Sequence, residues 1–177
     1  MKSQLAFLKL IYPAFVCIIF IFTTKVNLEY YPLIFGVTIG LFNVKHNRHP
    51  VLLGILLCVI ASYMSFFAGY LGFFLLLGFF KPLLGEEIGA YIFIILCPFI
   101  ISPIILYYLL KYLFDIGNNK VNNYIMFFSI VTLVIIAVVF FLKAQGIYDY
   151  DYNSLFSPYV LWSFIMAFSI QILIKKT

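Results

Sequence analysis

Charged side chains are scarce in this sequence. Of its 177 residues only 10% are charged, whereas 66% are hydrophobic and 21% are aromatic. A soluble domain keeps its surface hydrated with roughly a quarter charged residues, so this composition excludes an ordinary soluble domain. The apolar residues come in long runs, and a helix needs about 20 apolar residues to cross a bilayer. The sequence therefore predicts an integral membrane protein.

The sequence has few cysteines and histidines that could bind a metal or form disulfides. Cys17, Cys58 and Cys97 are odd in number and lie inside apolar runs, without a CxxC pair. His46 and His49 form an H-x-x-H pair, but a zinc site needs three or four ligands and no acid or cysteine is adjacent. We expect no metal site, no disulfide framework and no cofactor, and each cysteine is expected to act as a small hydrophobe.

Ionisable groups are missing from the middle of the long apolar runs. Proton-coupled carriers and ion pumps place such groups at that depth, and an intramembrane hydrolase needs a nucleophile with its base. Lys9 and Lys143 lie close enough to the ends of their runs for the side chains to reach the interface. We therefore predict no catalytic residue. The interior hydroxyls and amides can join helices or line a neutral pocket.

One acidic pair resembles part of a known motif. Glu86 and Glu87 resemble the start of the EExxxR motif of the CPBP family of intramembrane proteases. Tyr91 occupies the position of the arginine, and no histidine follows downstream, although that family uses later histidines. The resemblance ends at this dipeptide and does not predict protease activity.

The apolar runs and the short polar links between them predict an all-α, polytopic helical bundle that forms one transmembrane domain. Six spans are expected, at about 5–24, 30–44, 51–72, 88–113, 121–143 and 158–174. Residues 51–80 are apolar almost throughout, and one helix over them would measure about 45 Å against a hydrocarbon core of about 30 Å. Either this helix is tilted and projects outward, or it ends near Gly69–Gly72 and residues 73–87 form an interfacial or re-entrant segment.

Basic residues are concentrated in alternate links. With a cytoplasmic N-terminus, the inside set contains Asp115 and the basic residues Lys2, Lys9, Lys45, Arg48, Lys111, Lys120, Lys175 and Lys176. The outside links hold Lys25, Lys81 and Lys143 with the remaining acids. This asymmetry follows the positive-inside rule and predicts that both termini are cytoplasmic.

The net charge of +5 is then an orientation signal, and no nucleic-acid partner is expected. A single arginine stands beside many lysines, and Ile, Phe, Tyr and Asn are abundant. This usage is typical of an AT-rich genome. We accordingly predict a multi-pass protein of a bacterial cytoplasmic membrane, with the lipid bilayer as its first partner.

Small residues recur at helical spacing in two of the predicted spans. Gly36 and Gly40 form a GxxxG pattern, which permits close approach of two helices. In the third span, a stripe of small residues comprises Ala61, Ser65, Ala68 and Gly72. We expect both sets to pack against neighbouring helices. The opposite face of the third span is aromatic, and is expected to contact lipid, a partner or an apolar pocket; it comprises Tyr63, Phe66, Phe67, Tyr70, Phe73 and Phe74.

Two prolines interrupt the fourth predicted span. Pro98 and Pro103 each remove a backbone donor, and the freed carbonyls need partners such as the hydroxyl of Ser102. Most such kinks are structural, but transporters also bind substrate at broken helices near mid-depth. Pro98, Ser102, Pro103 and Ser65 of the third span are therefore the candidate pocket residues.

The link between the second and third spans carries a basic cluster. It contains Lys45, His46, Arg48 and His49 in the sequence KHNRHP. A solvated loop is the simpler interpretation, and contact with anionic lipid headgroups is the functional one.

Three function classes follow. The first, which the sequence favours, is a non-enzymatic accessory, binding or immunity-type protein that docks another membrane component. The second is a small transport component that binds a neutral or aromatic solute near Pro98–Pro103. In size and span count it resembles the substrate-binding subunits of energy-coupling-factor importers, although the small-residue motifs of their first helix are not found. The third is a lipid-modifying enzyme at a membrane face that uses His46, His49, Glu86 and Glu87. The oligomeric state does not follow from the sequence.

Overall fold

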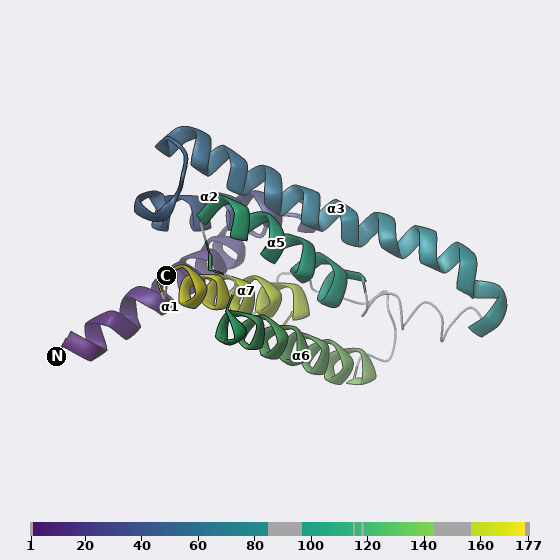
Figure 1. The fold of residues 1–177 in the computed structure, drawn as a ribbon. Helices are drawn as coiled ribbons and strands as arrows, with labels where there is room; N and C mark the ends of the chain where they lie inside the picture. Colours follow the sequence, from purple (N-terminus) through teal and green to yellow (C-terminus); the bar gives the residue numbers. More distant parts are fainter. Residues whose placement is uncertain (1, 85–96, 115, 118, 144–156, 176–177) are drawn as a thin grey trace.

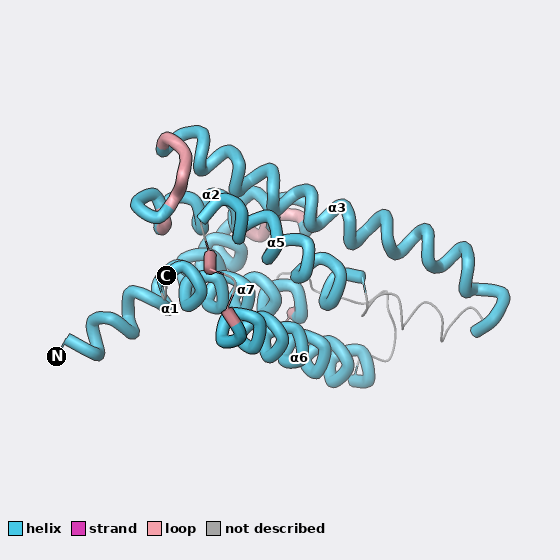
Figure 2. Tube along the Cα trace, in the orientation of Figure 1, coloured by secondary structure: helices cyan, strands magenta, loops and turns pink. Residues whose placement is uncertain are grey.

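The computed structural model describes residues 2–84, 97–114, 116–117, 119–143 and 157–175. All regular elements in these ranges are helices (Figure 2). The long ones are α1 (Lys2–Thr24), α2 (Tyr31–Phe42), α3 (Val51–Leu84), α5 (Ser102–Phe114), α6 (Lys120–Lys143) and α7 (Pro158–Lys175). Three short turns accompany them, namely η1 (Leu28–Tyr30), η2 (Val44–His46) and the π-helical η3 (Cys97–Ile101).

The helices form one bundle in which α2 and α5 pack on α3, and α1 and α6 pack on α7. Figure 1 shows that the two ends of the chain lie on the same side of this bundle, together with the α2–α3 link and the end of α5. The backbone N–H of Arg48 donates to the carbonyl of Leu113 over 3.2 Å, which ties the α2–α3 link to α5.

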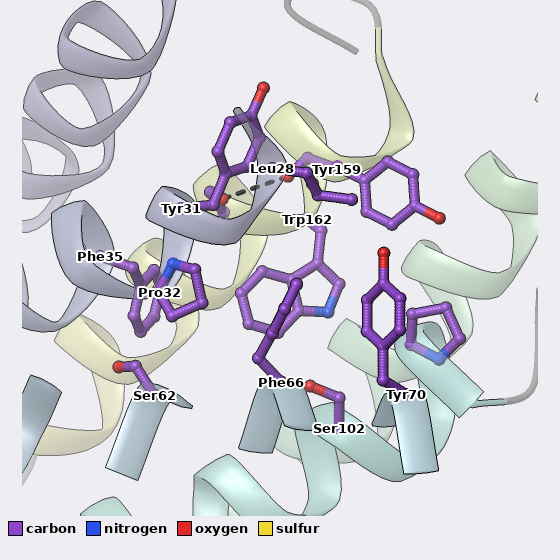
Figure 3. Close-up of a pocket in the computed structure, with 12 residues that line it drawn as sticks. Leu28, Tyr31, Pro32, Phe35, Ser62, Phe66, Tyr70, Ser102, Tyr159 and Trp162 are labelled. Atoms are coloured by element: carbon purple, nitrogen blue, oxygen red, sulfur yellow. Dashed lines mark hydrogen bonds between the residues drawn. The ribbon is translucent and has the colours of Figure 1, made fainter. Parts of the chain in front are cut away.

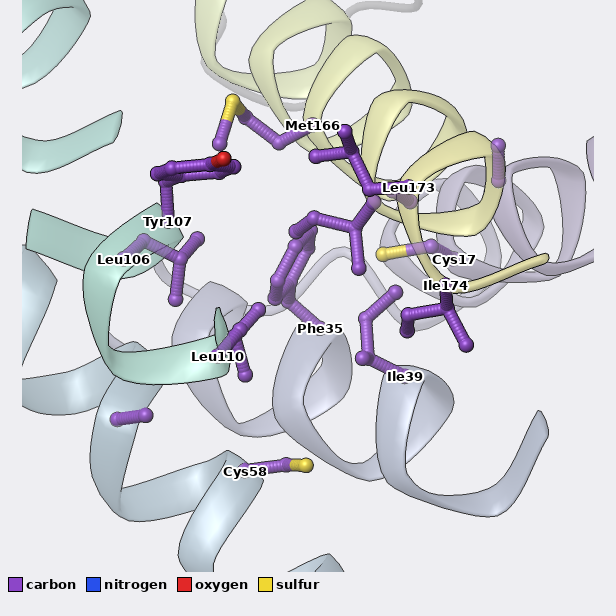
Figure 4. Close-up of a cluster of buried hydrophobic side chains, with 14 of the residues drawn as sticks. Cys17, Phe35, Ile39, Cys58, Leu106, Tyr107, Leu110, Met166, Leu173 and Ile174 are labelled. Atoms are coloured by element: carbon purple, nitrogen blue, oxygen red, sulfur yellow. The ribbon is translucent and has the colours of Figure 1, made fainter. Parts of the chain in front are cut away.

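The core is apolar and lies between the helices. Figure 4 shows side chains from five helices meeting there, among them Cys17, Phe35, Cys58, Leu110 and Ile174. Large apolar side chains also cover the outside, where Leu52 is 82% exposed and Phe128 is 64% exposed. An apolar outside requires an apolar solvent, because water would make this surface costly.

Within the described ranges, three helices are long and apolar enough to cross a membrane, and they cover Val51–Gly72, Cys97–Phe114 and Lys120–Phe140. Shorter apolar helices cover Leu8–Thr24, Leu28–Phe42 and Pro158–Ile174. These features support a membrane protein. The 12 residues of α2 extend for only about 18 Å, which is less than a hydrocarbon core of about 30 Å.

The longest helix, α3, continues through residues 73–84, a segment for which the sequence left a projecting helix and an interfacial segment both open. Its 34 residues give a length of about 51 Å. No break occurs at Gly69 or Gly72, because both glycines have a helical neighbour to pack against.

The fourth predicted span begins, in the described residues, with a wide turn rather than a kinked α-helix. Pro98 has no N–H to donate to the preceding turn, and the chain forms the π-helical η3 around it. Pro103 is the second residue of α5 and follows η3 directly, so its missing N–H falls where the wide turn passes into the α-helix. Residues 88–96 of that predicted span lie outside the described residues.

Candidate functional site

The small stripe of α3 faces the wide turn. The Ser65 hydroxyl donates to the Ser102 carbonyl over 2.8 Å, and the two hydroxyl oxygens are 2.7 Å apart. A Cβ on Gly69 would lie 3.3 Å from the Cβ of Ser102 and 3.4 Å from the Cys97 carbonyl oxygen. A Cβ on Gly72 would lie 3.6 Å from the Cys97 sulfur. Small side chains therefore let η3 and the start of α5 lie close to α3, where a hydrogen bond holds them.

The other small residues line neighbouring contacts. Ala61 is buried and Ala68 is half-buried on the same helix. On α2, a Cβ added to Gly36 would lie 2.5 Å from the Cα of Val59, and one on Gly40 would lie 2.8 Å from the Cα of Ile55. The GxxxG pattern thus brings the α2 backbone against the α3 backbone within one chain.

A cavity of about 40 Å³ lies between α2, α3, the wide turn and α7 (Figure 3). Its wall is mostly aromatic and apolar, and it comprises Leu28, Tyr31, Pro32, Phe35, Ser62, Phe66, Tyr70, Pro98, Ser102, Tyr159, Trp162 and Ser163. Among its described residues, this wall contains no acid, lysine, arginine or histidine. The volume has room for about three water molecules.

The four candidate pocket residues do not all line the same cavity. Pro98 and Ser102 line the cavity, whereas the hydroxyl of Ser65 is used by Ser102 behind the wall. Pro103 lines a separate cavity of about 10 Å³ between α5, α6 and α7. There the hydroxyls of Ser129 and Ser169 are 2.6 Å apart and join α6 to α7.

Most of the cavity wall was not among the candidates taken from the sequence. The aromatic face of α3 contained Phe66 and Tyr70, but nothing in it pointed to a partner on α7. Trp162, Ser163 and Tyr159 lie about 60 residues after Pro98, and no local pattern links the two segments. Their only signal is the tryptophan itself, since it is the single one in the chain.

Two serine hydroxyls in the wall already donate within the protein. Ser62 donates to the Cys58 carbonyl over 2.8 Å, and Ser163 donates to the Tyr159 carbonyl over 3.1 Å. The indole N–H of Trp162 is different. Its nitrogen is buried and has no hydrogen-bond partner among the described residues. In Figure 3 this nitrogen is on the edge of the ring turned toward Tyr70.

A wider cleft of about 540 Å³ adjoins the cavity on the outside of the bundle. It runs between η1 and the middle of α3, and its residues are Asn27, Leu28, Glu29, Phe66, Phe67, Tyr70 and Leu71. Leu28, Phe66 and Tyr70 line both spaces, so they form the wall between them. The Phe66 and Tyr70 ring centroids are 4.8 Å apart, so the two rings lie together in the lining that cleft and cavity share.

The basic cluster lies at the opposite end of α2. Lys45, His46 and Arg48 are exposed and His49 is half-buried. The backbone N–H of His49 donates to the Asn47 side-chain oxygen over 3.0 Å, which shapes the loop. Within the described ranges, no group of three His, Cys, Asp or Glu side chains is placed to hold a metal ion. Glu86 and Glu87 lie outside the described residues.

Comparison of this chain with protein-family models, curated proteins and solved structures found no match.

Proposed function

We propose that this protein is a non-enzymatic, multi-pass membrane protein that binds a neutral apolar molecule, as a binding or transport component. The observation that carries the proposal is the aromatic cavity between α2, α3, α5 and α7. Ligand sites are concave and mostly apolar, with a few placed polar groups, and this wall has that composition.

The lining favours a neutral ligand. An ion in an apolar wall without a counter-charge would carry a large desolvation cost. Apart from its serine and tyrosine hydroxyls, the described lining offers no base or nucleophile of the kinds that enzymes use, and the hydroxyls of Ser62 and Ser163 are engaged with carbonyls. Binding therefore explains this site better than catalysis does.

The cavity is too small to hold a whole ligand of ordinary size. Ligand sites commonly have volumes of about 300–1,000 Å³, and the cavity alone has about 40 Å³. The adjoining cleft has about 540 Å³. We infer that the body of the ligand occupies the cleft and that one end enters the cavity past Phe66 and Tyr70.

We also propose that the chain crosses the membrane six times with both termini in the cytoplasm, as expected from the apolar runs and the charge distribution. In that orientation the cleft at η1 opens on the outer side, and the basic cluster contacts the cytoplasmic leaflet. A bacterial cytoplasmic membrane remains part of the proposal.

The proposal can be tested with a substitution that fills the cavity. Ser62→Leu would place a larger side chain in the cavity, and Thr132→Leu is its control, because Thr132 is exposed on α6 and also donates to a carbonyl of its own helix. The proteins are purified from native membranes in mild detergent, and small molecules that co-purify are identified by mass spectrometry. We expect the ligand retained by the wild type to fall about tenfold in Ser62→Leu, equivalent to about 1.4 kcal/mol, and to remain in Thr132→Leu.

Two results would contradict the proposal. The first is a wild-type protein that retains no small molecule. The second is a stoichiometric protein partner whose binding is unaffected by Ser62→Leu, which would favour the accessory or immunity-type class.

A further inference from the structure

Among the serine and tryptophan side chains of the cavity wall, one polar atom has no hydrogen-bond partner in the described part of the protein. The Ser62 and Ser163 hydroxyls donate to carbonyls of their own helices, and Ser102 is bonded to Ser65. Pro98 has no N–H. The indole N–H of Trp162 is buried without a partner in the described part of the chain.

The direction of this donor is fixed by packing. Trp162 lies on α7, and its ring packs on that of Phe35 from α2, with centroids 5.5 Å apart. Phe35 is itself fully buried, so the indole has little freedom to turn its N–H elsewhere. A fixed donor in an apolar wall discriminates between ligands that accept a hydrogen bond and ligands that do not, because leaving it unpaired is costly.

We propose that the ligand carries a hydrogen-bond acceptor, a carbonyl or ether oxygen on an otherwise apolar body, and that Trp162 Nε1 donates to it. The indole N–H can only donate, which excludes ligands whose sole polar group is another donor. This inference rests on the proposed function. Trp162 is then the residue that determines specificity, while Phe66 and Tyr70 control access.

The experiment uses a pair of probes that differ by one acceptor. Tetrahydrofuran and cyclopentane have similar five-membered rings and differ mainly in the ring oxygen of tetrahydrofuran. Each is titrated into detergent-purified protein, and its affinity is taken from the rise in melting temperature with concentration. The same titrations are made with Trp162→Phe, which keeps an aromatic ring and removes the donor.

The ratio of the two affinities is the quantity compared, because partition into detergent cancels between the two proteins. We expect the preference for tetrahydrofuran over cyclopentane to be about fivefold greater in the wild type than in Trp162→Phe, as one hydrogen bond would give. Equal ratios would overturn the acceptor assignment and leave the proposed function standing. Failure of both probes to bind the wild type would instead count against the proposed function.

A second readout does not depend on the variant. Because Trp162 is the only tryptophan, its fluorescence reports on the cavity alone. An acceptor on the indole N–H shifts emission to longer wavelength, so tetrahydrofuran should shift the wild-type spectrum and cyclopentane should not. Identical spectra with both probes would mean that the donor is satisfied by water only, and would overturn the proposal.

Mass spectrometry distinguishes a lipid from a free solute as the molecule that carries the acceptor. The molecules to identify are those that co-purify with the wild type and are depleted from Trp162→Phe. A phospholipid in this set would assign an acyl ester carbonyl as the acceptor. A smaller ketone, quinone or ether would assign a free solute. If both proteins retain the same molecules in the same amounts, the acceptor assignment is wrong.

Discussion

The hydroxyl of Ser65 joins two helices inside the bundle. It is fully buried and bonds to Ser102 across the α3–α5 contact. Hydrogen bonds between membrane helices contribute about 0.6 kcal/mol on average and up to about 1.7 kcal/mol. We expect Ser65→Ala to lower the free energy of unfolding by an amount in this range, measured by unfolding in mixed micelles.

The control is Ser62→Ala on the same helix. Ser62 bonds to the Cys58 carbonyl within α3, so its loss removes no contact between helices. We expect the stability of this variant to change by less than about 0.5 kcal/mol. Equal losses in the two variants would show that the Ser65–Ser102 bond adds nothing to helix association.

At the residue scale, the sequence located part of the site. Proline positions are explicit in a sequence, and an interrupted helix with a nearby serine follows from the missing N–H at Pro98, whereas the π-helical form of that interruption does not. The role of Trp162 does not follow, because an unpaired indole N–H is a property of the folded environment. The burial of Phe35 was equally hidden, since it lies in a run that is apolar on all sides.

At the element scale, the contact between α2 and α3 depends on backbone proximity. A methyl group at Gly36 would lie within contact distance of backbone atoms of Val59 and Cys58, which cannot rotate away. We expect Gly36→Ala to separate the two helices and to lower stability by about 1–3 kcal/mol. Thermal unfolding in detergent measures the loss.

Gly78→Ala is the matched control for this change, because nothing lies within 4 Å of a Cβ added at that position of α3. Alanine is the better helix former, so we expect Gly78→Ala to be neutral or slightly stabilising. If Gly36→Ala behaved in the same way, close approach would not be what holds α2 on α3.

At the scale of the whole molecule, topology is open to direct test. Reporters fused after Thr177 and inserted at 118–119 should both report the cytoplasm, and one inserted at Tyr150 should report the outside, because the basic links are expected inside. A C-terminal reporter on the outside would overturn the predicted orientation. A single additional crossing between residues 66 and 84 would reverse all three reporters, because all three follow that segment.

The all-helical class and the apolar outside could be predicted from composition and run length, because lipid demands both. The number of spans could not be settled in the same way. α2 is shorter than the membrane core, and α3 is longer. The distribution of apolar residues along a sequence does not show which helices end at the same depth in the membrane. How α2 and α3 align depends on their packing, which a single sequence does not display.

Because α3 is longer than the membrane core, its length bears on how the proposed ligand would reach the cleft. With Val51 at one membrane surface, Leu71 lies about 30 Å along the helix, near the level of the opposite headgroups. The cleft beside Phe67 and Leu71 would then open sideways into the edge of the lipid leaflet. A ligand would arrive by lateral diffusion, and occupancy would follow its mole fraction in the lipid. Diluting the protein in buffer at a fixed ligand-to-lipid ratio would therefore leave the site equally full.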